Sequence, residues 1–183
     1  MPQIEVFTNG TFPDALRWQA VAFMRVEWPF VFQGAGRLLA HPYPPSEEQI
    51  HIAMVEGEVL MSYATLLVID QPHGGTTYRM YGLGNMFTFP PYRREGLGRQ
   101  VIHAATRYLQ NSEADMGALL CGEDLVPMYG AHGWVAASAP TYEGAPEQAK
   151  PIEAVRMIIL VSKRVQRERD RLLHTPMYVV GGW

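Results

Sequence analysis

Two glycines and three arginines gather in residues 93–99, and this is the stretch whose residue types could do chemistry. The apolar run Met86–Phe89 before it predicts a strand, and apolar residues at helical spacing from Val101 to Leu109 predict a helix after it. The first turn of a helix carries unpaired N–H groups and partial positive charge. Gly96 and Gly98 leave these groups uncovered, so the segment predicts a phosphate or pyrophosphate site.

Two familiar phosphate motifs do not fit the spacing. The chain has no G-x-x-x-x-G-K-[ST], the pattern of a P-loop. The dinucleotide fingerprint G-x-G-x-x-G fails at Gln100–Val101. An ordinary strand-to-helix connection with basic surface residues is the structural alternative, and a site for some other phosphorylated ligand also stays open.

The segment Arg93–Gly98 resembles the R-x-x-G-x-G signature of the GCN5-related N-acetyltransferase (GNAT) superfamily. The residues before it, Thr88–Arg93, are also similar to those of the family. A second segment, Glu123–Trp134, reads EDLVPMYGAHGW. It looks like the family's next short helix and its closing Tyr-x-x-x-Gly-aromatic element, and the two segments support each other by their order and distance.

The resemblance implies that acetyl-coenzyme A is the cofactor. In this family the turn amides hold the pyrophosphate, and the preceding strand offers backbone groups to the pantetheine arm. The cofactor-binding residues implied in this way are Met86, Phe87, Thr88, Phe89, Arg93, Arg94, Glu95, Gly96, Leu97, Gly98 and Arg99.

The resemblance places Tyr129 at the position that often protonates the leaving thiolate. A phenol held near the sulfur can supply that proton as a general acid. The alternative is that Tyr129 only packs its ring. The reaction implied is direct transfer of an acetyl group to a primary amine of a small molecule, with no covalent enzyme intermediate and no metal site.

The acceptor side is predicted less directly. Trp28 and Phe32 lie on an irregular stretch, Trp28–Pro45, whose aromatic side chains could line a substrate pocket or fill the core beneath a loop. The layout from Glu58 onward looks closest to the aminoglycoside 2′-N-acetyltransferases, in which a C-terminal tryptophan carboxylate faces the substrate. That likeness makes Trp183 and Asn85 candidate substrate residues.

The likeness to that branch fails at one position, because Gly84 stands where the branch has a glutamate proposed to deprotonate the amine. An acceptor amine must lose its proton before it can attack. Glu27, His41, His51 and a water relay are the candidates for this role. Without the glutamate, two further hypotheses stay open: a coenzyme A-binding sensor or interaction module without catalysis, and an acyltransferase that uses a longer acyl-coenzyme A.

The resemblance, together with the order of the predicted strands and helices, implies an α/β (α+β) fold of GNAT type, with a mixed, mostly antiparallel, splayed sheet flanked by helices. Gly82 and Gly84 indicate a bulge or close ligand approach within one strand. We expect a single acetyltransferase domain over residues 1–183 with a C-terminal tail, 162–183. The predicted strands are 3–7, Ile50–Val55, Glu58–Ile69, Tyr78–Phe89, Gly117–Cys121, Trp134–Ser138 and Val155–Val161, and the predicted helices begin at Pro13, after the turn that ends at Arg99, at Glu123 and at Ser162.

Composition limits the partners and the compartment. A net charge of −3 in 183 residues gives no general attraction to nucleic acid, and no apolar run approaches the length of a membrane span. A single cysteine, Cys121, fits a reducing compartment and is expected to be buried and structural. With no signal peptide visible, we expect a cytoplasmic protein that acts on a small-molecule amine, and a homodimer is an assembly that this fold allows.

Overall fold

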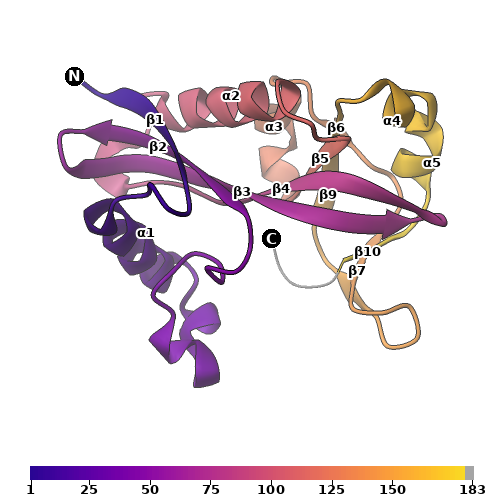
Figure 1. The fold of residues 1–183 in the computed structure, drawn as a ribbon, viewed down its shortest axis with the longest axis horizontal. Helices are drawn as coiled ribbons and strands as arrows, with labels where there is room; N and C mark the ends of the chain where they lie inside the picture. Colours follow the sequence, from indigo (N-terminus) through magenta and orange to yellow (C-terminus); the bar gives the residue numbers. More distant parts are fainter. Residues whose placement is uncertain (180–183) are drawn as a thin grey trace. The chain divides into compact units, whose positions relative to one another are not determined.

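The computed structural model describes residues 1–179 of the chain (Figure 1). Its contacts divide the chain into two compact units. Unit 1 holds Met1–Leu67 and Asn85–Ala105, and unit 2 holds Val68–Gly84 and the chain from Thr106 onward. The expectation of a single domain therefore stays a prediction.

The strands form one sheet of seven strands, in the order β1-β2-β3-β4-β5-β9-β6, and one of three, in the order β10-β7-β8. In the larger sheet, β1–β2, β2–β3, β5–β9 and β6–β9 pair antiparallel, whereas β4–β5 is parallel. The predicted mixed, mostly antiparallel sheet is confirmed. The strand bounds are β1 Gln3–Thr8, β2 Gln49–Glu56, β3 Val59–His73, β4 Thr76–Thr88, β5 Met116–Cys121, β6 Val135–Ala136, β7 Thr141–Glu143, β8 Lys150–Ile152, β9 Val155–Leu160 and β10 Met177–Val179.

Five α-helices and four short 3-10 turns connect these strands within the described residues. None of these helices combines the length and the apolar character needed to cross a membrane. The helices are α1 Asp14–Glu27, α2 Leu97–Gln110, α3 Val126–Gly130, α4 Lys163–Arg167 and α5 Arg169–His174, and the turns are η1 Pro29–Phe32, η2 Gly34–Leu38, η3 Pro90–Tyr92 and η4 Glu123–Leu125.

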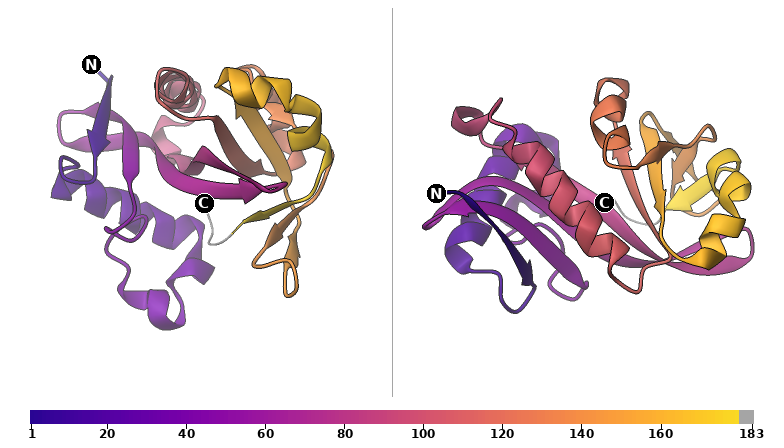
Figure 2. Two further views of the ribbon diagram at one scale, coloured as in Figure 1. Left: turned by 45° about the vertical axis from the view of Figure 1, so that its right-hand side comes forward. Right: turned by 90° about the horizontal axis from the view of Figure 1, so that it is seen from above.

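In unit 1, α1 and the first part of α2 cover opposite faces of β2 and β3 (Figures 1 and 2). Helix α1 buries the apolar stripe Leu16, Ala20, Phe23 and Met24, whose spacing follows one helix face. An aromatic cluster joins this stripe to the sheet, because the rings of Phe23 and Phe87 stack with centroids 4.3 Å apart. The core of unit 1 therefore fixes the last residues of β4.

In unit 2, α4, α5 and β10 pack against the central strands through a core of buried apolar residues. The prediction of one helix over Ser162–His174 is wrong. The helix is interrupted at Glu168, which takes φ −105° and ψ 15° between α4 and α5. The Glu168 carboxylate accepts a hydrogen bond from the Tyr78 hydroxyl at 2.6 Å and pairs with Arg171. The long-range bond to Tyr78 outweighs the helical preference of the segment.

The smaller sheet was not predicted. The polar, proline- and glycine-bearing sequence of residues 140–151 predicts a flexible loop, but the segment contains β7 and most of β8, which pair antiparallel. Strand β10 joins them in parallel, with Met177 opposite Thr141, and the rings of Tyr142 and Tyr178 stack at 5.2 Å. Three-residue strands give little periodic signal, and the third strand, β10, comes from a distant part of the sequence.

We expect Gly117→Ala to destabilise the protein. A Cβ atom at this position on β5 would lie 2.3 Å from Leu109 Cδ1, 2.9 Å from Ile159 Cγ2 and 3.0 Å from Trp134 Cη2. Urea unfolding should show a loss of about 1–3 kcal/mol, the usual cost of overpacking a core. Gly10→Ala is the matched control, because a Cβ there meets nothing within 4 Å. Equal stability of the two variants would contradict this packing.

Candidate active site

The predicted phosphate turn has the backbone of an anion site. Arg94 and Gly96 both take positive φ, at 69° and 79°, and reverse the chain between η3 and α2. Helix α2 begins at Leu97, and the Gln100 amide bonds to the Gly96 carbonyl at 3.2 Å. The amides of Leu97, Gly98 and Arg99 precede that bond, so they are the unpaired donors of a helix N-terminus. The predicted donors therefore lie together.

Gly98 also lies close to the preceding strand. A Cβ atom there would lie 3.0 Å from Thr88 Oγ1 and 3.2 Å from Met86 Cε. Any side chain at this position would therefore press on the end of β4 while covering the helix N-terminus. The requirement for glycine is one of space, since its φ is not in the left-handed range.

The three arginines of the turn are exposed, as is Glu95. Arg93 is partly engaged, because its Nε donates to the Thr88 carbonyl at 2.9 Å and its guanidinium lies 3.6 Å from the Glu27 carboxylate. Arg93 thus links the turn to the end of β4. Sequence reasoning placed Arg93 in the turn but gave no sign of this pair, whose members are far apart in the chain.

Along the end of β4, the backbone N–H and C=O groups face alternately toward β3 and away from it. The Phe89 amide is taken by the Met61 carbonyl at 2.9 Å, and the Phe87 carbonyl accepts the Ser62 hydroxyl at 2.8 Å. Backbone groups alternate in direction along a strand, so those of Met86 and Thr88 face away from β3. Of the four predicted pantetheine-binding residues, Met86 and Thr88 are the two whose backbone groups face away from β3.

The irregular residue of β4 is Asn85. It adopts φ 51°, an uncommon conformation for a residue with a side chain, and its Nδ2 atom is buried with no hydrogen-bond partner in the described chain. The parallel ladder to β5 covers only the pairs from Met80 to Gly82. Glycines predicted an interruption here, and it falls one residue after Gly84. Backbone strain of this kind clusters at functional sites.

In unit 2, Tyr129 lies on α3 and is 5% exposed. Burial, together with the nearby Cys121 thiol, raises the pKa of Tyr129 to about 12. The phenol therefore keeps its proton at neutral pH, as a general acid must. The segment after it is fixed, because Gly133 takes φ 88° and the Trp134 indole donates to Thr106 Oγ1 at 3.0 Å.

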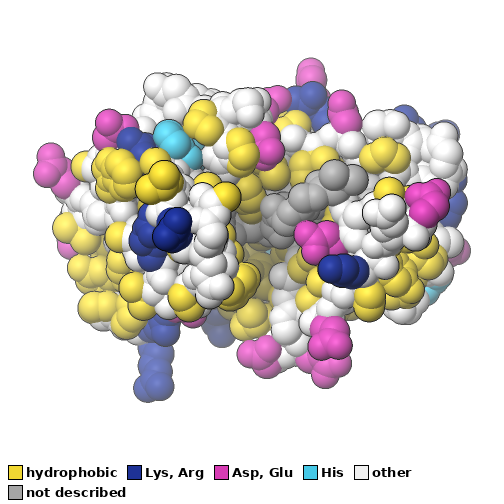
Figure 3. Space-filling view, turned by 90° about the horizontal axis from the view of Figure 1, so that it is seen from below, with side chains coloured by type: hydrophobic (Ala, Val, Ile, Leu, Met, Phe, Trp, Pro, Cys, Tyr) yellow, Lys and Arg dark blue, Asp and Glu magenta, His cyan; other side chains and the backbone are white. Residues whose placement is uncertain are grey.

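The predicted acceptor residues in unit 1 are partly buried. Trp28 and Phe32 pack against the core cluster of α1, and the Arg25 guanidinium lies 4.4 Å from the Phe32 ring centroid. The turns η1 and η2 leave Phe30 and Leu38 exposed, and Figure 3 shows hydrophobic side chains gathered over this part of the chain. Trp183, the remaining candidate, lies outside the described residues.

Of the candidate bases, His51 is the least suited. It is 3% exposed, its Nδ1 lies 2.6 Å from the Tyr63 hydroxyl, and the Phe12 ring stacks on it at 4.2 Å. Burial, with the nearby His41, lowers the pKa of His51 to about 4, far from the value a base needs at neutral pH. Burial also lowers the pKa of His41, and Glu27 is paired with Arg93.

Comparison with known proteins agrees with this geometry. The family model described as "Acetyltransferase (GNAT) domain" matches residues 3–137, well over half of the chain. The chain therefore belongs to the GNAT acetyltransferase family. It is an acyltransferase, and acyl-coenzyme A-dependent acyl transfer is the activity of its family. No curated protein sequence matches it.

Solved structures share the fold at low identity. Escherichia coli ElaA is 16% identical, with a TM-score of 0.59 over 86% of this chain and 99% of its own. An acyl-CoA N-acyltransferase from Pseudomonas aeruginosa is 19% identical, with a TM-score of 0.56 over 86% and 99%. BjaI, a CoA-dependent acyl-homoserine lactone synthase solved with SAM and isopentyl-CoA, is 13% identical, with a TM-score of 0.60 over 100% and 95%.

We expect the buried His51 to make the free energy of unfolding depend on pH. The unfolded chain binds a proton at His51 near the ordinary pKa of 6.5, whereas the folded protein resists it down to about pH 4. Stability should therefore be full above pH 6.5 and fall as the pH drops toward 4, by about 3 kcal/mol from this residue. Urea unfolding of wild type and His51→Gln across this range measures it. The variant should lose less stability on acidification, and parallel pH curves would contradict the assignment.

Proposed function

We propose that this protein transfers an acetyl group from acetyl-coenzyme A directly to a primary amine of a small molecule. The observation that carries the proposal is the turn at Arg94–Gly98, whose positive-φ residues open the first amides of α2 beside exposed arginines. A pyrophosphate suits such a site, because it accepts several N–H donors and carries negative charge. The Leu97, Gly98 and Arg99 amides would hold it, with Arg94 and Arg99 adding charge.

The rest of the chain supplies the other groups for the chemistry. The outward backbone groups of Met86 and the backbone amide of Thr88 would pair with the amide groups of the pantetheine arm, since the Thr88 carbonyl already accepts from Arg93 Nε. The amine nitrogen attacks the thioester carbonyl, a C–N bond forms, and the C–S bond breaks as the tetrahedral intermediate collapses. Tyr129 gives its proton to the leaving thiolate and takes one back from the nitrogen. Positioning of two bound reactants would supply much of the rate.

One structural neighbour favours a second candidate for the acyl group. BjaI was solved with isopentyl-CoA, so this fold also accommodates a branched chain longer than acetyl on coenzyme A. A longer acyl-coenzyme A would leave the turn and Tyr129 in the same roles and change only the acyl pocket. Turnover with a series of acyl-coenzyme A donors separates the two. Aminoglycosides stay a predicted acceptor class on the likeness of sequence alone, because Gly84 replaces the glutamate of that branch.

Gly98→Glu tests the turn. The new carboxylate would cover the α2 amides and repel a pyrophosphate, and its Cβ would press on Thr88 and Met86. Calorimetric titration with coenzyme A should show affinity at least about tenfold weaker, the loss expected when charged hydrogen bonds disappear. Gly10→Glu is the control, because that position is open. Equal affinity of the two variants would remove the turn from the cofactor site.

Tyr129→Phe tests the acid. We expect kcat to fall about a hundredfold or more, the range for a lost general acid, while the affinity for coenzyme A is unchanged. Because the pKa of Tyr129 is raised to about 12, the ratio of wild-type to variant rates should stay constant from neutral pH to about pH 10. Tyr142→Phe, a hydroxyl removed from β7, is the control. A rate equal to that control would end the proposed role of Tyr129.

A further inference from the structure

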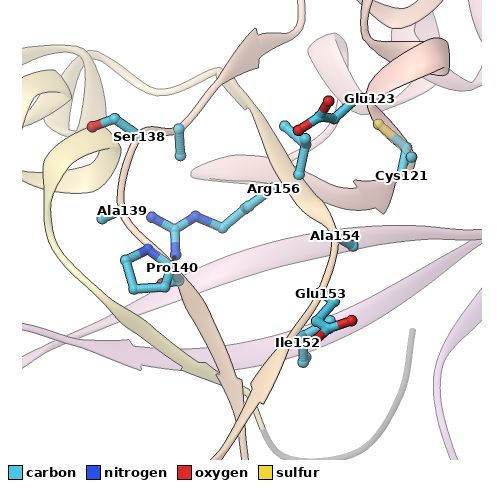
Figure 4. A pocket seen from close by; sticks show the side chains of 12 residues that line it. Cys121, Glu123, Ser138, Ala139, Pro140, Ile152, Glu153, Ala154 and Arg156 are labelled. Atoms are coloured by element: carbon cyan, nitrogen blue, oxygen red, sulfur yellow. Dashed lines mark hydrogen bonds between the residues drawn. The ribbon is translucent and has the colours of Figure 1, made fainter.

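A pocket of about 500 Å³ lies wholly within unit 2, at the carboxyl end of β5 (Figure 4). Its walls are the end of β5 with Cys121 and Glu123, the segment after β6, and the start of β9. Cys121 also lies close enough to Tyr129 to influence the pKa of that phenol. The pocket therefore shares Cys121 with the surroundings of the residue proposed as the acid.

The pocket is lined by a buried arginine. Arg156 is 1% exposed, and in Figure 4 its side chain runs from β9 toward Ala139 and Pro140. Its Nη1 donates to the Pro140 carbonyl and Thr141 Oγ1, both at 3.2 Å. Its Nη2 donates to the Leu172 and Thr175 carbonyls at 3.2 and 3.1 Å. These bonds fix the guanidinium in one orientation.

The charge of Arg156 is not neutralised within the described residues. All four bonded oxygens belong to neutral groups, and no ion pair of the described chain involves this side chain. A guanidinium has five N–H donors, and the fifth, on Nε, has no partner among these residues. A buried cation of this kind is costly unless an anion meets it. The signal is already in the sequence, as an arginine inside the apolar run Val155–Leu160.

We propose that this pocket binds the acceptor, and that the acceptor is an amine that also bears a carboxylate, as an amino acid does. The carboxylate accepts from Arg156 Nε, and the ammonium faces the exposed carboxylates of Glu123 and Glu153 on the other walls. In Figure 4, Glu123 stands beside Cys121, on the opposite side of the pocket from the Arg156 guanidinium. The inference rests on the proposed amine acylation and names its substrate class.

The charges around the pocket favour a molecule that carries both a positive and a negative group over a simple cation or a simple anion. A simple cation would meet the two rim carboxylates but leave Arg156 unpaired. A simple anion would meet Arg156 but be repelled by Glu123 and Glu153. Because Arg156 is shielded from bulk water, its attraction for a carboxylate is weakly screened. Burial lowers the pKa of Arg156 only to about 10, so the side chain stays charged at neutral pH.

Binding is tested on the wild-type protein without any need for turnover. The Arg156 Nε–H resonance, assigned in a ¹H–¹⁵N spectrum by its loss in Arg156→Lys, is followed during titration with glycine, acetate and methylamine at constant ionic strength. Glycine should shift this resonance most, acetate less and methylamine least. No shift with glycine or acetate at tens of millimolar would overturn the proposal.

Turnover gives the second test. Acetyl transfer is measured to amino acids and, as matched partners, to their amides and decarboxylated amines, with aminoglycosides and polyamines alongside. The carboxylate-bearing member of each active pair should have kcat/KM at least about tenfold higher, the cost of leaving a buried donor unmet. A protein that binds acetyl-coenzyme A but acylates only carboxylate-free amines would overturn this inference and leave the proposed function standing.

Variants of Arg156 distinguish recognition of the acceptor carboxylate from a purely structural role of this side chain. Arg156→Gln should raise the KM of the carboxylate-bearing acceptor at least about tenfold and leave the KM of acetyl-coenzyme A unchanged. Arg156→Lys should restore part of the loss. Arg167→Gln, which removes an exposed charge on α4, is the control. If Arg156→Gln weakens acceptors with and without a carboxylate equally, Arg156 only supports the fold.

Discussion

The unpaired amides at the start of α2 are the constraint on which the candidate site depends. A helix cannot satisfy its first N–H groups internally, and here Arg94 and Gly96 turn the chain so that they stay open beside exposed arginines. Several features of unit 1 support this turn. The Phe89 amide is bonded to Met61, the Phe87 ring is packed under α1, and Arg93 is braced by Thr88 and Glu27.

Unit 2 contributes buried side chains, a phenol and a guanidinium, whereas unit 1 contributes backbone amides. Its buried phenol, Tyr129, keeps its proton because burial raises its pKa, and its buried guanidinium, Arg156, keeps its charge although no described carboxylate pairs with it. Tyr129 is held by the local turn at Gly133, whereas Arg156 is held by four neutral oxygens from two distant segments of the chain. A protonated acid and a fixed cation are what amide formation and carboxylate recognition require.

The sequence predicted the features that are local in the chain. The turn could be predicted because its glycines, its arginines and the periodic segments on either side all lie in the one continuous stretch Met86–Leu109. The family also followed from local motifs, and the matching family model confirms it. Features set by distant partners could not be predicted. The pairing of β10 with β7, the break at Glu168 and the orphan Nε of Arg156 all depend on residues far apart in sequence.

The central claim is that the turn before α2 binds the pyrophosphate of acyl-coenzyme A. Calorimetric titration of the wild-type protein with acetyl-coenzyme A and with S-acetylpantetheine, which lacks every phosphate, tests it most directly. We expect micromolar binding of acetyl-coenzyme A and an affinity for S-acetylpantetheine that is lower by at least about a hundredfold, since several charged hydrogen bonds are absent. Equal binding of both ligands, or no binding of acetyl-coenzyme A, would contradict it.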